Sequence, residues 1–316
     1  MKLGIVMDPI AGIKTAKDSS FAMLLAAQAR GWEVYYMEMP DLYLRDSEAR
    51  ATMRQLTLRD TPADWYTPGA PDDAALSTLD IILMRKDPPF DSQYLLATYI
   101  LEQAERNGSL VMNRPYGLRS ANEKLFTLHV PQCTPPTIVT QHSQRIREFL
   151  DEHEDIIVKP PDGMGGHSVF RLRHGDPNTS VILETVTAHN TRYAIAQTYL
   201  PAITDGDKRI LMIDGEPVPY ALARIPSGTD ARANLAAGGS GKGVDLTDRD
   251  TWICEQVRPL LKEYGIYFAG LDVIGDVLTE INVTSPTCIR ELDQIYDLDI
   301  AGDLLARLQA IYQQHT

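Results

Sequence analysis

The segment Ile157-Val158-Lys159-Pro160-Pro161-Asp162-Gly163-Met164-Gly165-Gly166-His167-Ser168 leads from an apolar strand through a lysine into a glycine-rich turn. Glycines let backbone N–H groups point at one place and approach phosphate oxygens closely, and a lysine adds positive charge for the same anion. The GxGxxG spacing fails because Ser168 occupies the last glycine position, and the residues behind it read as another strand. The segment therefore predicts an anion-binding strand–turn–strand unit, with an ordinary glycine turn beside a surface lysine as the alternative.

The stretch Gly270–Val283 reads as a second decisive unit, a tight β-hairpin. Side chains two positions apart on a strand share a face, so Leu278 and Glu280 are expected on the same side. Pairing Ile274 with Leu278 would set Asp272 opposite Glu280. The hairpin is thus expected to bring two carboxylates together.

Asp272, Glu280 and Asn282 form the candidate metal site of this hairpin. Two carboxylates and an amide oxygen make a hard, all-oxygen donor set, which Mg²⁺ accepts while it keeps waters and bridges phosphates. The alternative is a solvated acidic strand face, but facing carboxylates repel each other unless a cation is present. We therefore predict a divalent-cation site here.

Basic residues gather at the ends of other expected strands. Lys208-Arg209 and Arg224 lie on the strands that flank the turn Asp214-Gly215, and Arg85-Lys86 follows the strand Leu79–Met84. The carboxyl end of a strand is where open α/β sheets bind ligands, and arginine pairs with carboxylates and phosphates through two parallel hydrogen bonds. In an acidic chain these residues indicate anion capture, although each one alone fits a surface ion pair.

The segment Ile225–Val244 has little periodicity and is predicted to be a lid. Arg232 and Asn234 give it polar contacts for a ligand, and its glycines would let the backbone move. The alternative is an insert without function. The glycines are Gly228, Gly238, Gly239, Gly241 and Gly243.

Strands and helices alternate over the first 115 residues, which predicts βαβ units and a mainly parallel sheet. The proline-bearing stretch Arg59–Asp73 is expected to be a loop. The expected strands are Leu3–Met7, Glu33–Met37, Leu79–Met84 and Ser109–Met112, and the expected helices are Phe21–Arg30 and Tyr94–Arg106.

Beyond Pro115 the pattern changes to an α+β arrangement with antiparallel strands. Helices are expected at Ser120–Leu128, Ser143–His153, Thr247–Tyr264 and Ile300–Gln313. Strands are expected at Thr137–Val139, Ile156–Lys159, Ser168–Arg173, Tyr193–Tyr199, Arg209–Ile213, Val218–Arg224, Gly270–Ile274 and Val277–Val283.

Composition narrows the classes of protein. The 316 residues carry a net charge of −13, which argues against a non-specific nucleic-acid binder. Cys133, Cys254 and Cys288 form no zinc or disulfide pattern, and no apolar stretch approaches the roughly 20 residues that span a bilayer. No HExxH motif and no nucleophile–base pair stands out. We expect a cytoplasmic protein that binds neither nucleic acid nor membrane.

In this order, the motifs resemble the ATP-grasp ligases, and most closely the bacterial glutathione synthetase family. The likeness covers nearly the whole chain. It departs at Ala233, where a glycine is expected, and at Ser240, where relatives can carry arginine. It is carried by Asn122-Glu123-Lys124-Leu125-Phe126, Lys159 with Asp162–Gly166, Asp214–Tyr220, Asn234–Gly239, Thr279–Cys288 and Arg85-Lys86-Asp87-Pro88-Pro89-Phe90-Asp91.

The resemblance implies a fold and a role for each matching residue. Residues 1–120 would form the N-terminal domain, and 121–200 and 201–316 two subdomains that grip ATP. ATP would be held by Lys124, Lys159, Gly163, Met164, Gly165, Gly166, Gln197, Thr198, Tyr199, Leu200, Lys208 and Asn282. Arg209 and Arg224 would be catalytic, Mg²⁺ or Mn²⁺ would bind Asp272, Glu280 and Asn282, the substrate would meet Arg85, Asp87, Ser285, Pro286 and Thr287, and the lid would use Arg232, Asn234, Gly238 and Gly239.

The implied reaction joins glycine to γ-glutamylcysteine at the expense of ATP, through an acyl phosphate. Such chemistry needs positioning and positive charge rather than a protein nucleophile, which agrees with the motifs found. The resemblance also implies a homo-oligomer, a tetramer. Two alternatives stay open: another carboxylate–amine ligase, such as a D-alanine–D-alanine ligase or an amino-acid ligase acting on a protein tail, and a nucleotide-binding regulatory module without turnover.

Overall fold

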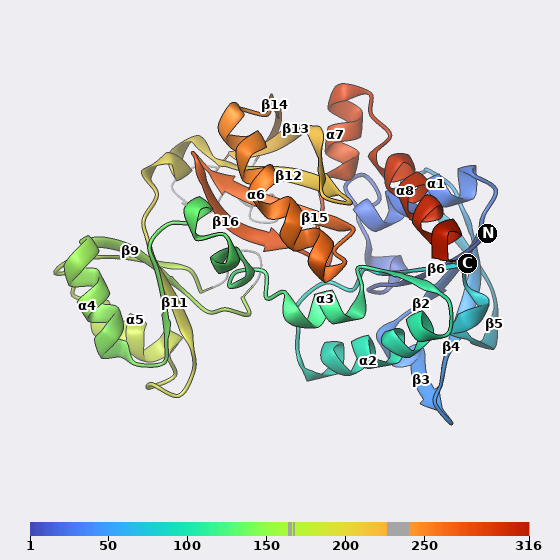
Figure 1. Ribbon diagram of the computed structural model, residues 1–316, viewed down its shortest axis with the longest axis horizontal. Helices are drawn as coiled ribbons and strands as arrows, with labels where there is room; N and C mark the ends of the chain where they lie inside the picture. The colour runs from blue at the N-terminus through green and yellow to red at the C-terminus, as the bar shows by residue number, and fades with distance from the viewer. Residues whose placement is uncertain (164–165, 167, 226–239, 316) are drawn as a thin grey trace.

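The computed structural model describes residues 1–163, 166, 168–225 and 240–315, and it arranges them around three β-sheets (Figure 1). A seven-stranded sheet uses the strands up to residue 112, a four-stranded sheet those between 137 and 198, and a five-stranded sheet those between 207 and 282. The predicted α/β class, with an α+β C-terminal half, is confirmed.

The seven-stranded sheet has a parallel centre with antiparallel additions. Its strands are β1 (Lys2–Val6), β2 (Glu33–Met37), β3 (Leu42–Arg45), β4 (Glu48–Leu58), β5 (Tyr66–Ala75), β6 (Ile81–Met84) and β7 (Leu110–Met112). Strands β2, β1, β6 and β7 lie side by side in parallel, and β4 joins β2 and carries β3 and β5 antiparallel. The expected βαβ arrangement therefore forms the centre of this sheet.

Helices cover both faces of this sheet, because its central strands are apolar on both sides. The helices are α1 (Ser19–Ala29), α2 (Ser92–Arg106), α3 (Pro115–Ser120) and α8 (Ile300–His315). Leu3 packs with α1 and α8 in one core, and Val6 packs with α2 in another. Asp18 caps α1 by accepting a hydrogen bond from the Phe21 N–H at 2.6 Å. The C-terminal helix thus returns to the first sheet (Figure 1).

The prediction of a loop over Arg59–Asp73 is wrong, since most of β5 lies there. Pro68 and Pro71 stand opposite Leu56 and Arg54 of β4. Proline cannot donate to a ladder, so it is tolerated where one side of the strand has no partner, and β5 pairs only with β4 among the described strands. Prolines here mark an edge strand rather than the absence of a strand.

The four-stranded sheet carries Lys159, at the end of one of its strands. Its strands are β8 (Thr137–Thr140), β9 (Asp155–Lys159), β10 (Phe170–Arg173) and β11 (Ala194–Thr198), and its helices are α4 (Ser143–His153) and α5 (Thr179–Val186). Ile156 and Val158 pack under the two helices. Because side chains alternate along a strand, Ile157 and Lys159 face the opposite side, where they line a cleft.

The five-stranded sheet is antiparallel and forms the other wall. Its strands are β12 (Asp207–Ile213), β13 (Glu216–Ile225), β14 (Ser240–Asp245), β15 (Phe268–Ile274) and β16 (Val277–Asn282), and its helices are α6 (Asp248–Tyr264) and α7 (Ile289–Tyr296). Helix α6 packs on one face through Ile253 and Val257. All of strand β14 except Asp245 lies within the predicted lid segment, and residues 226–239 of that segment lie outside the described residues.

The register of the β15–β16 hairpin differs from the expected one. Asp272 does stand opposite Glu280, but Ile274 pairs with Val277 rather than with Leu278, and a bulge lies between Asp272 and Val273. The bulge changes which side chains share a face. Leu278 therefore packs in the core with α6 and not beside Glu280.

The helix predicted over Ser120–Leu128 does not form. Helix α3 ends at Ser120, and a short 3-10 helix, Phe126–His129, follows after a turn. The Asn122 side chain accepts hydrogen bonds from the N–H groups of Lys124 and Leu125, at 3.2 and 3.0 Å. Asparagine competes with the helix for these donors. Lys124 consequently sits on a turn rather than on a helix.

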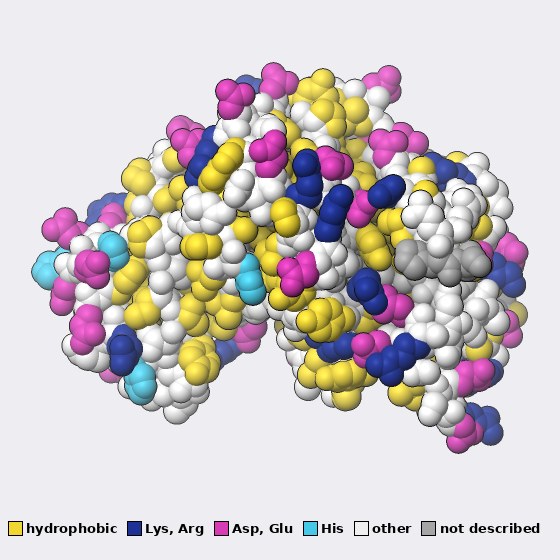
Figure 2. Space-filling model, in the orientation of Figure 1, with side chains coloured by type: hydrophobic (Ala, Val, Ile, Leu, Met, Phe, Trp, Pro, Cys, Tyr) yellow, Lys and Arg dark blue, Asp and Glu magenta, His cyan; other side chains and the backbone are white. Residues whose placement is uncertain are grey.

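The surface gives a first indication of where the parts meet. On the face shown in Figure 2 a notch separates the end that carries α4 and α5 from the end that carries α2 and α3. Acidic and basic side chains are interspersed over this face. Within the described residues, no helix combines the length and the apolar character needed to cross a membrane.

Candidate active site

A cleft of about 560 Å³ opens between the four-stranded and the five-stranded sheets. Most of the residues predicted from the sequence meet in it, although they come from distant parts of the chain. They are Asp87, Lys124, Lys159, Gly163, Gly166, Gln197, Thr198, Tyr199, Leu200, Arg209, Arg224, Asp272, Glu280, Asn282, Ser285 and Thr287.

Three of the predicted residues that the structure describes do not line the cleft. Lys208 lies on the opposite face of β12, where its ammonium contacts the buried Asp250 carboxylate at 2.5 and 2.6 Å. Arg85 and Pro286 lie behind the lining rather than in it. Met164, Gly165, Arg232, Asn234, Gly238 and Gly239 lie outside the described residues.

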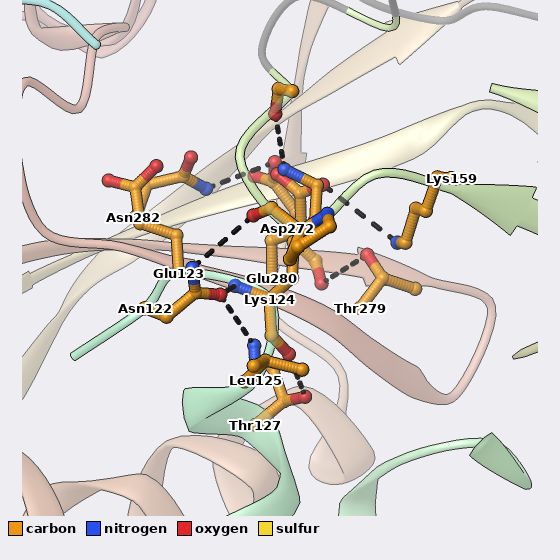
Figure 3. Close-up of polar contacts among 12 residues, drawn as sticks. Asn122, Glu123, Lys124, Leu125, Thr127, Lys159, Asp272, Thr279, Glu280 and Asn282 are labelled. Carbon is orange, nitrogen blue, oxygen red and sulfur yellow. Dashed lines mark hydrogen bonds and ion pairs between the residues drawn. The ribbon is translucent and has the colours of Figure 1, made fainter. Parts of the chain in front are cut away.

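Two lysines share one carboxylate in the middle of the cleft (Figure 3). The Glu280 Oε1 atom lies 3.6 Å from Lys124 Nζ and 3.9 Å from Lys159 Nζ. Lys124 also donates to the Gly163 carbonyl, which ties the turn to this group. Burial lowers the pKa of the Lys159 ammonium despite the attraction of Glu280. Two buried cations facing one carboxylate leave positive charge that an anion would neutralise.

A denser network of charges lies beside the lysines. Arg209 donates two hydrogen bonds to Asp272, at 2.6 and 2.8 Å, and Arg224 Nη2 lies 2.9 Å from the same carboxylate. Arg224 also pairs with Asp207. Burial acts to raise the pKa of the Asp272 carboxyl, but the two guanidinium groups outweigh it and hold that pKa well below its usual range. Asp272 is therefore a carboxylate fixed in place by arginines.

The donors predicted for a metal fit a hard divalent cation, though not equally. Glu280 makes only the long contacts to the lysines, and the Asn282 amide donates to Asp272 Oδ2 and to the Gly270 carbonyl, each at 3.2 Å. That geometry leaves the Asn282 amide oxygen for another partner. Asp272 is already engaged by two arginines. Among the described residues, no group of three or more His, Cys, Asp or Glu side chains is placed to hold a metal.

One end of the cleft is suited to a flat, weakly polar group. Gln197, Thr198, Tyr199 and Leu200 line it, and the Gln197 side chain is held by Thr137 Oγ1 at 3.0 Å. The Arg171 guanidinium lies 3.4 Å from the centre of the Tyr199 ring. Apolar walls complete this end, contributed by Ile157, Val169, Ile203 and Ile274.

The other end is polar and is formed by the proline loop, defined here as Val283–Thr287, together with Asp87 and Pro88. The Arg85 guanidinium is buried behind it and donates to the Pro286 carbonyl at 2.8 Å and to Ser20 Oγ at 3.0 Å. Within the described residues no carboxylate forms an ion pair with Arg85 at the distances seen elsewhere in the cleft. Asp87 therefore presents a carboxylate at this end, while the positive charge of Arg85 lies behind the loop.

Sequence reasoning did not identify Asp207 and Glu123 as site residues. Asp207 stands opposite Arg224, but a bulge near Met212 shifts that register, so counting back from the turn does not find the pair. Glu123 accepts hydrogen bonds from Val283 and Thr284, which lie 160 residues further along the chain. Its neighbour Lys124 was the only signal for it.

Family models and relatives match the chain closely. Residues 1–119 match the model "Prokaryotic glutathione synthetase, N-terminal domain", and residues 123–297 match "Prokaryotic glutathione synthetase, ATP-grasp domain". The glutathione synthetase of Pseudomonas putida is 61% identical over 305 residues, covering 96% of each chain. That of Escherichia coli strain K12 is 57% identical over 314 residues, covering 99% of each.

Solved structures of lower identity share the fold. The crystal structure of D-cycloserine synthetase DcsG matches with a TM-score of 0.69 at 15% identity, over the whole of both chains. A RimK domain ATP-grasp protein from Sphaerobacter thermophilus matches with a TM-score of 0.63 at 16% identity, over 98% of this chain and 100% of that one. At such identities the likeness shows the ATP-grasp fold alone.

Proposed function

The chain belongs to the prokaryotic glutathione synthetase family, and on that premise we propose how its cleft carries out ATP-dependent glutathione synthesis. The reaction is ATP + γ-glutamylcysteine + glycine → glutathione + ADP + phosphate. A carboxylate is a poor electrophile, so the cysteinyl carboxylate takes the γ-phosphoryl group of ATP. The glycine amine then attacks the resulting acyl phosphate, and inorganic phosphate leaves.

The lysine pair is our proposed site for the ATP phosphates. Lys124 and Lys159 are both buried and share only Glu280, so the phosphates would neutralise charge that is already concentrated there. The Gly163–Gly166 turn would cover the phosphates. The adenine would lie along Gln197–Leu200, where the cleft has apolar walls. Lys208, which contacts Asp250 instead, would support this wall from behind.

The arginines would stabilise the phosphoryl group during its transfer. Arg209 and Arg224 are fixed by Asp272 and Asp207, so little reorganisation is needed when negative charge develops near them. This gives preorganised positive charge without a protein nucleophile. The absence of a nucleophile–base motif in the sequence then has a chemical reason.

A divalent cation, Mg²⁺ with Mn²⁺ as the alternative, would be held by Glu280 and Asn282, with Asp272 as the third predicted ligand. When bound, such an ion withdraws negative charge from phosphate oxygens and orients them. The carboxylates of Asp207, Asp272 and Glu280 already face cationic side chains, namely Lys124, Lys159, Arg209 and Arg224. We therefore expect the cation to bind together with ATP rather than alone.

The substrate residues, the lid segment and the three units also have proposed roles. Arg85, Asp87, Ser285, Pro286 and Thr287 would form the site for γ-glutamylcysteine, with Asp87, Ser285 and Thr287 in the lining and the other two behind it. Segment 225–244 would cover the acyl phosphate, because two of its residues, Ile225 and Ser240, pair with each other beside Arg224. Unit 1–120 would then contribute to the substrate site, and units 121–200 and 201–316 would bind ATP between them.

The observation that carries this proposal is the meeting of Lys124, Lys159 and Glu280 with the two arginines in one cleft. The test measures ADP release with γ-glutamylcysteine, with and without glycine, and identifies the product by mass spectrometry. ADP and glutathione formed together, both dependent on glycine, are the expected result. ADP release only with two D-alanine molecules, or only with a protein tail and an amino acid, would indicate a different carboxylate–amine ligase. Nucleotide binding without ADP release for any carboxylate–amine pair would favour a regulatory module.

Assembly and location are also proposals. A homotetramer is what the family resemblance implies, and sedimentation equilibrium of the purified chain would test it. A cytoplasmic location is expected for an enzyme whose cysteines, Cys133, Cys254 and Cys288, are all buried as free thiols. Fractionation of the producing cells would test that expectation.

A further inference from the structure

The Glu123 carboxylate makes contacts that no step proposed so far uses. One carboxylate oxygen, Oε1, accepts from the Val283 N–H at 2.9 Å, the Thr284 N–H at 3.0 Å and the Thr284 hydroxyl at 2.9 Å. Hydrogen bonds to an ionised acceptor are about twice as strong as those between neutral groups. A single carboxylate oxygen therefore accepts both N–H groups at the start of the proline loop.

The proline loop needs such a clamp because it begins where β16 ends. Strand β16 stops at Asn282, so the N–H groups of Val283 and Thr284 have no partner in the sheet ladder. Pro286 has no N–H to donate. The other clamps on this loop are Asn113, which donates to the Val283 carbonyl at 2.7 Å, and Arg85, which donates to the Pro286 carbonyl. The loop is thus held in shape by side chains.

Glu123 also joins this loop to the two other parts of the cleft. The backbone carbonyl of Glu123 accepts a hydrogen bond from the Ile281 N–H at 2.8 Å, which attaches Glu123 to the β15–β16 hairpin. The next residue is Lys124, which contacts Gly163 and Glu280. The backbone of Glu123 therefore positions the phosphate side, and its carboxylate positions the proline loop.

We propose that Glu123 is a positioning residue for γ-glutamylcysteine, which acts through Thr284 by holding Ser285 and Thr287 against the substrate. This deepens the proposed function and rests on the role given there to the proline loop. The division between backbone and side chain makes the proposal specific. Removing the carboxylate should loosen the substrate end, while the backbone bond to Ile281 keeps Lys124 in place for ATP.

The test compares four variants with the wild-type enzyme: Glu123→Ala, Glu123→Gln, Thr284→Val and Glu263→Ala. Glu123→Gln keeps an oxygen that can accept the same donors without the charge. Thr284→Val removes only the hydroxyl donor and keeps both N–H groups. Glu263 lies exposed on α6 and serves as the matched control. The readouts are the KM values for γ-glutamylcysteine and ATP, the ADP formed per glutathione, and ATP affinity by calorimetry.

Glu123→Ala is expected to raise the KM for γ-glutamylcysteine by about tenfold or more, equivalent to about 1.4 kcal/mol. It should raise ADP per glutathione and leave ATP affinity within about twofold of wild type. The KM for γ-glutamylcysteine of Glu123→Gln should be close to wild type, because a neutral hydrogen bond keeps part of the interaction. The KM of Thr284→Val should lie between those of wild type and Glu123→Ala. The KM of Glu263→Ala should match wild type.

Equal losses for ATP and γ-glutamylcysteine in Glu123→Ala would overturn the proposal, as would unchanged KM values. If Glu123→Ala does not fold, Glu123→Gln and Thr284→Val decide alone, and wild-type values in Thr284→Val would then overturn it. The proposed function is judged separately, by whether the wild-type enzyme makes glutathione in the same assay.

Discussion

Two groups of charges in the cleft hold their cations differently: the lysine end, made of Lys124, Lys159 and Glu280, and the arginine end, made of Arg209, Arg224, Asp207 and Asp272. At the lysine end, two ammonium groups share the Glu280 carboxylate at 3.6 and 3.9 Å. At the arginine end, Asp272 receives Arg209 at 2.6 Å and Arg224 at 2.9 Å, and Arg224 has Asp207 as well. The lysine end thus has two cations and one carboxylate at long distances, and the arginine end has two cations and two carboxylates at close distances.

The difference indicates a division of labour between the two ends. Buried charges without close partners are costly, so the lysine end favours an incoming anion that neutralises it. Buried charges in close pairs are rigid, so the arginine end offers fixed dipoles to the reacting groups. We expect substitutions at the lysine end to affect ligand affinity most, and those at the arginine end to affect stability as well as turnover.

The largest effect is expected for Asp272→Ala. Removing this carboxylate takes from Arg209 its ion-pair partner among the described residues and from Arg224 one of two, which costs about 3–5 kcal/mol of the free energy of unfolding. Turnover should be lost with it. Urea unfolding followed by circular dichroism measures the stability change.

Asp155→Asn is the matched control for this prediction. Asp155 pairs with Arg171 through two hydrogen bonds, at 2.9 and 2.6 Å, but both side chains are about one third exposed. Exposed pairs contribute about 0–1 kcal/mol. If Asp272→Ala costs no more than Asp155→Asn, the arginine end is not a tightly coupled network.

The next effect concerns the lysines, and Lys159→Met is compared with Lys208→Met. Lys159→Met should weaken ATP binding by about tenfold to a hundredfold, since a hydrogen bond to a charged group is worth about 1.5–3 kcal/mol. Its melting temperature should stay unchanged or rise, because burial already lowers the pKa of Lys159 and so penalises its charged form. Calorimetry with ATP and thermal unfolding are the measurements.

Lys208→Met should show the opposite pattern. It leaves the Asp250 carboxylate, which is fully buried, without its cation, so stability should fall by a few kcal/mol while ATP affinity stays the same. A loss of ATP affinity in Lys208→Met that equals the loss in Lys159→Met would return Lys208 to the nucleotide site and blur the contrast between the two faces of β12.

The smallest effect is expected at Asp293, a half-buried acid outside the cleft. Burial raises the pKa of Asp293 to about 6, with Asp299 and Asp303 adding to the rise and the hydrogen bond from the Ile300 N–H opposing it. A raised folded-state pKa means that this group supports stability below its unfolded pKa of 3.8 and that the support is lost as the pH rises through about 6. Part of the wild-type decline in stability between these pH values should come from this residue.

Asp293→Asn should remove that part of the pH dependence and raise stability at neutral pH by roughly 1 kcal/mol, a value reduced because the group is partly exposed to water. Thermal unfolding from pH 4 to 7 compares the two proteins. Parallel stability curves for wild type and Asp293→Asn would show that Asp293 does not titrate in this range.

Much of this site follows from the sequence. The strand that ends at Lys159, the glycine turn behind it and the opposition of Asp272 and Glu280 are local patterns, and local patterns survive folding. The alternation along β12 also carries information, because neighbours on a strand face opposite sides. Lys208 and Arg209 could therefore have been separated from the sequence, with Arg209 in the cleft and Lys208 against α6.

The rest depends on features that a sequence pattern does not contain. The bulge beside Asp272 moves Leu278 into the core, and the bulge near Met212 brings Asp207 to Arg224. Glu123 reaches the proline loop only through the tertiary fold. Strand β5 was missed because its prolines are typical of a loop, and only the sheet topology shows that they lie on an edge strand.

The central claim is that the cleft converts the cysteinyl carboxylate of γ-glutamylcysteine into an acyl phosphate before the glycine amine attacks it. It is tested most directly by following heavy oxygen placed in the cysteinyl carboxylate of γ-glutamylcysteine. The account predicts that one labelled oxygen passes to inorganic phosphate for each glutathione formed, because the acyl phosphate carries it. Glutathione formed alongside unlabelled phosphate would contradict the account.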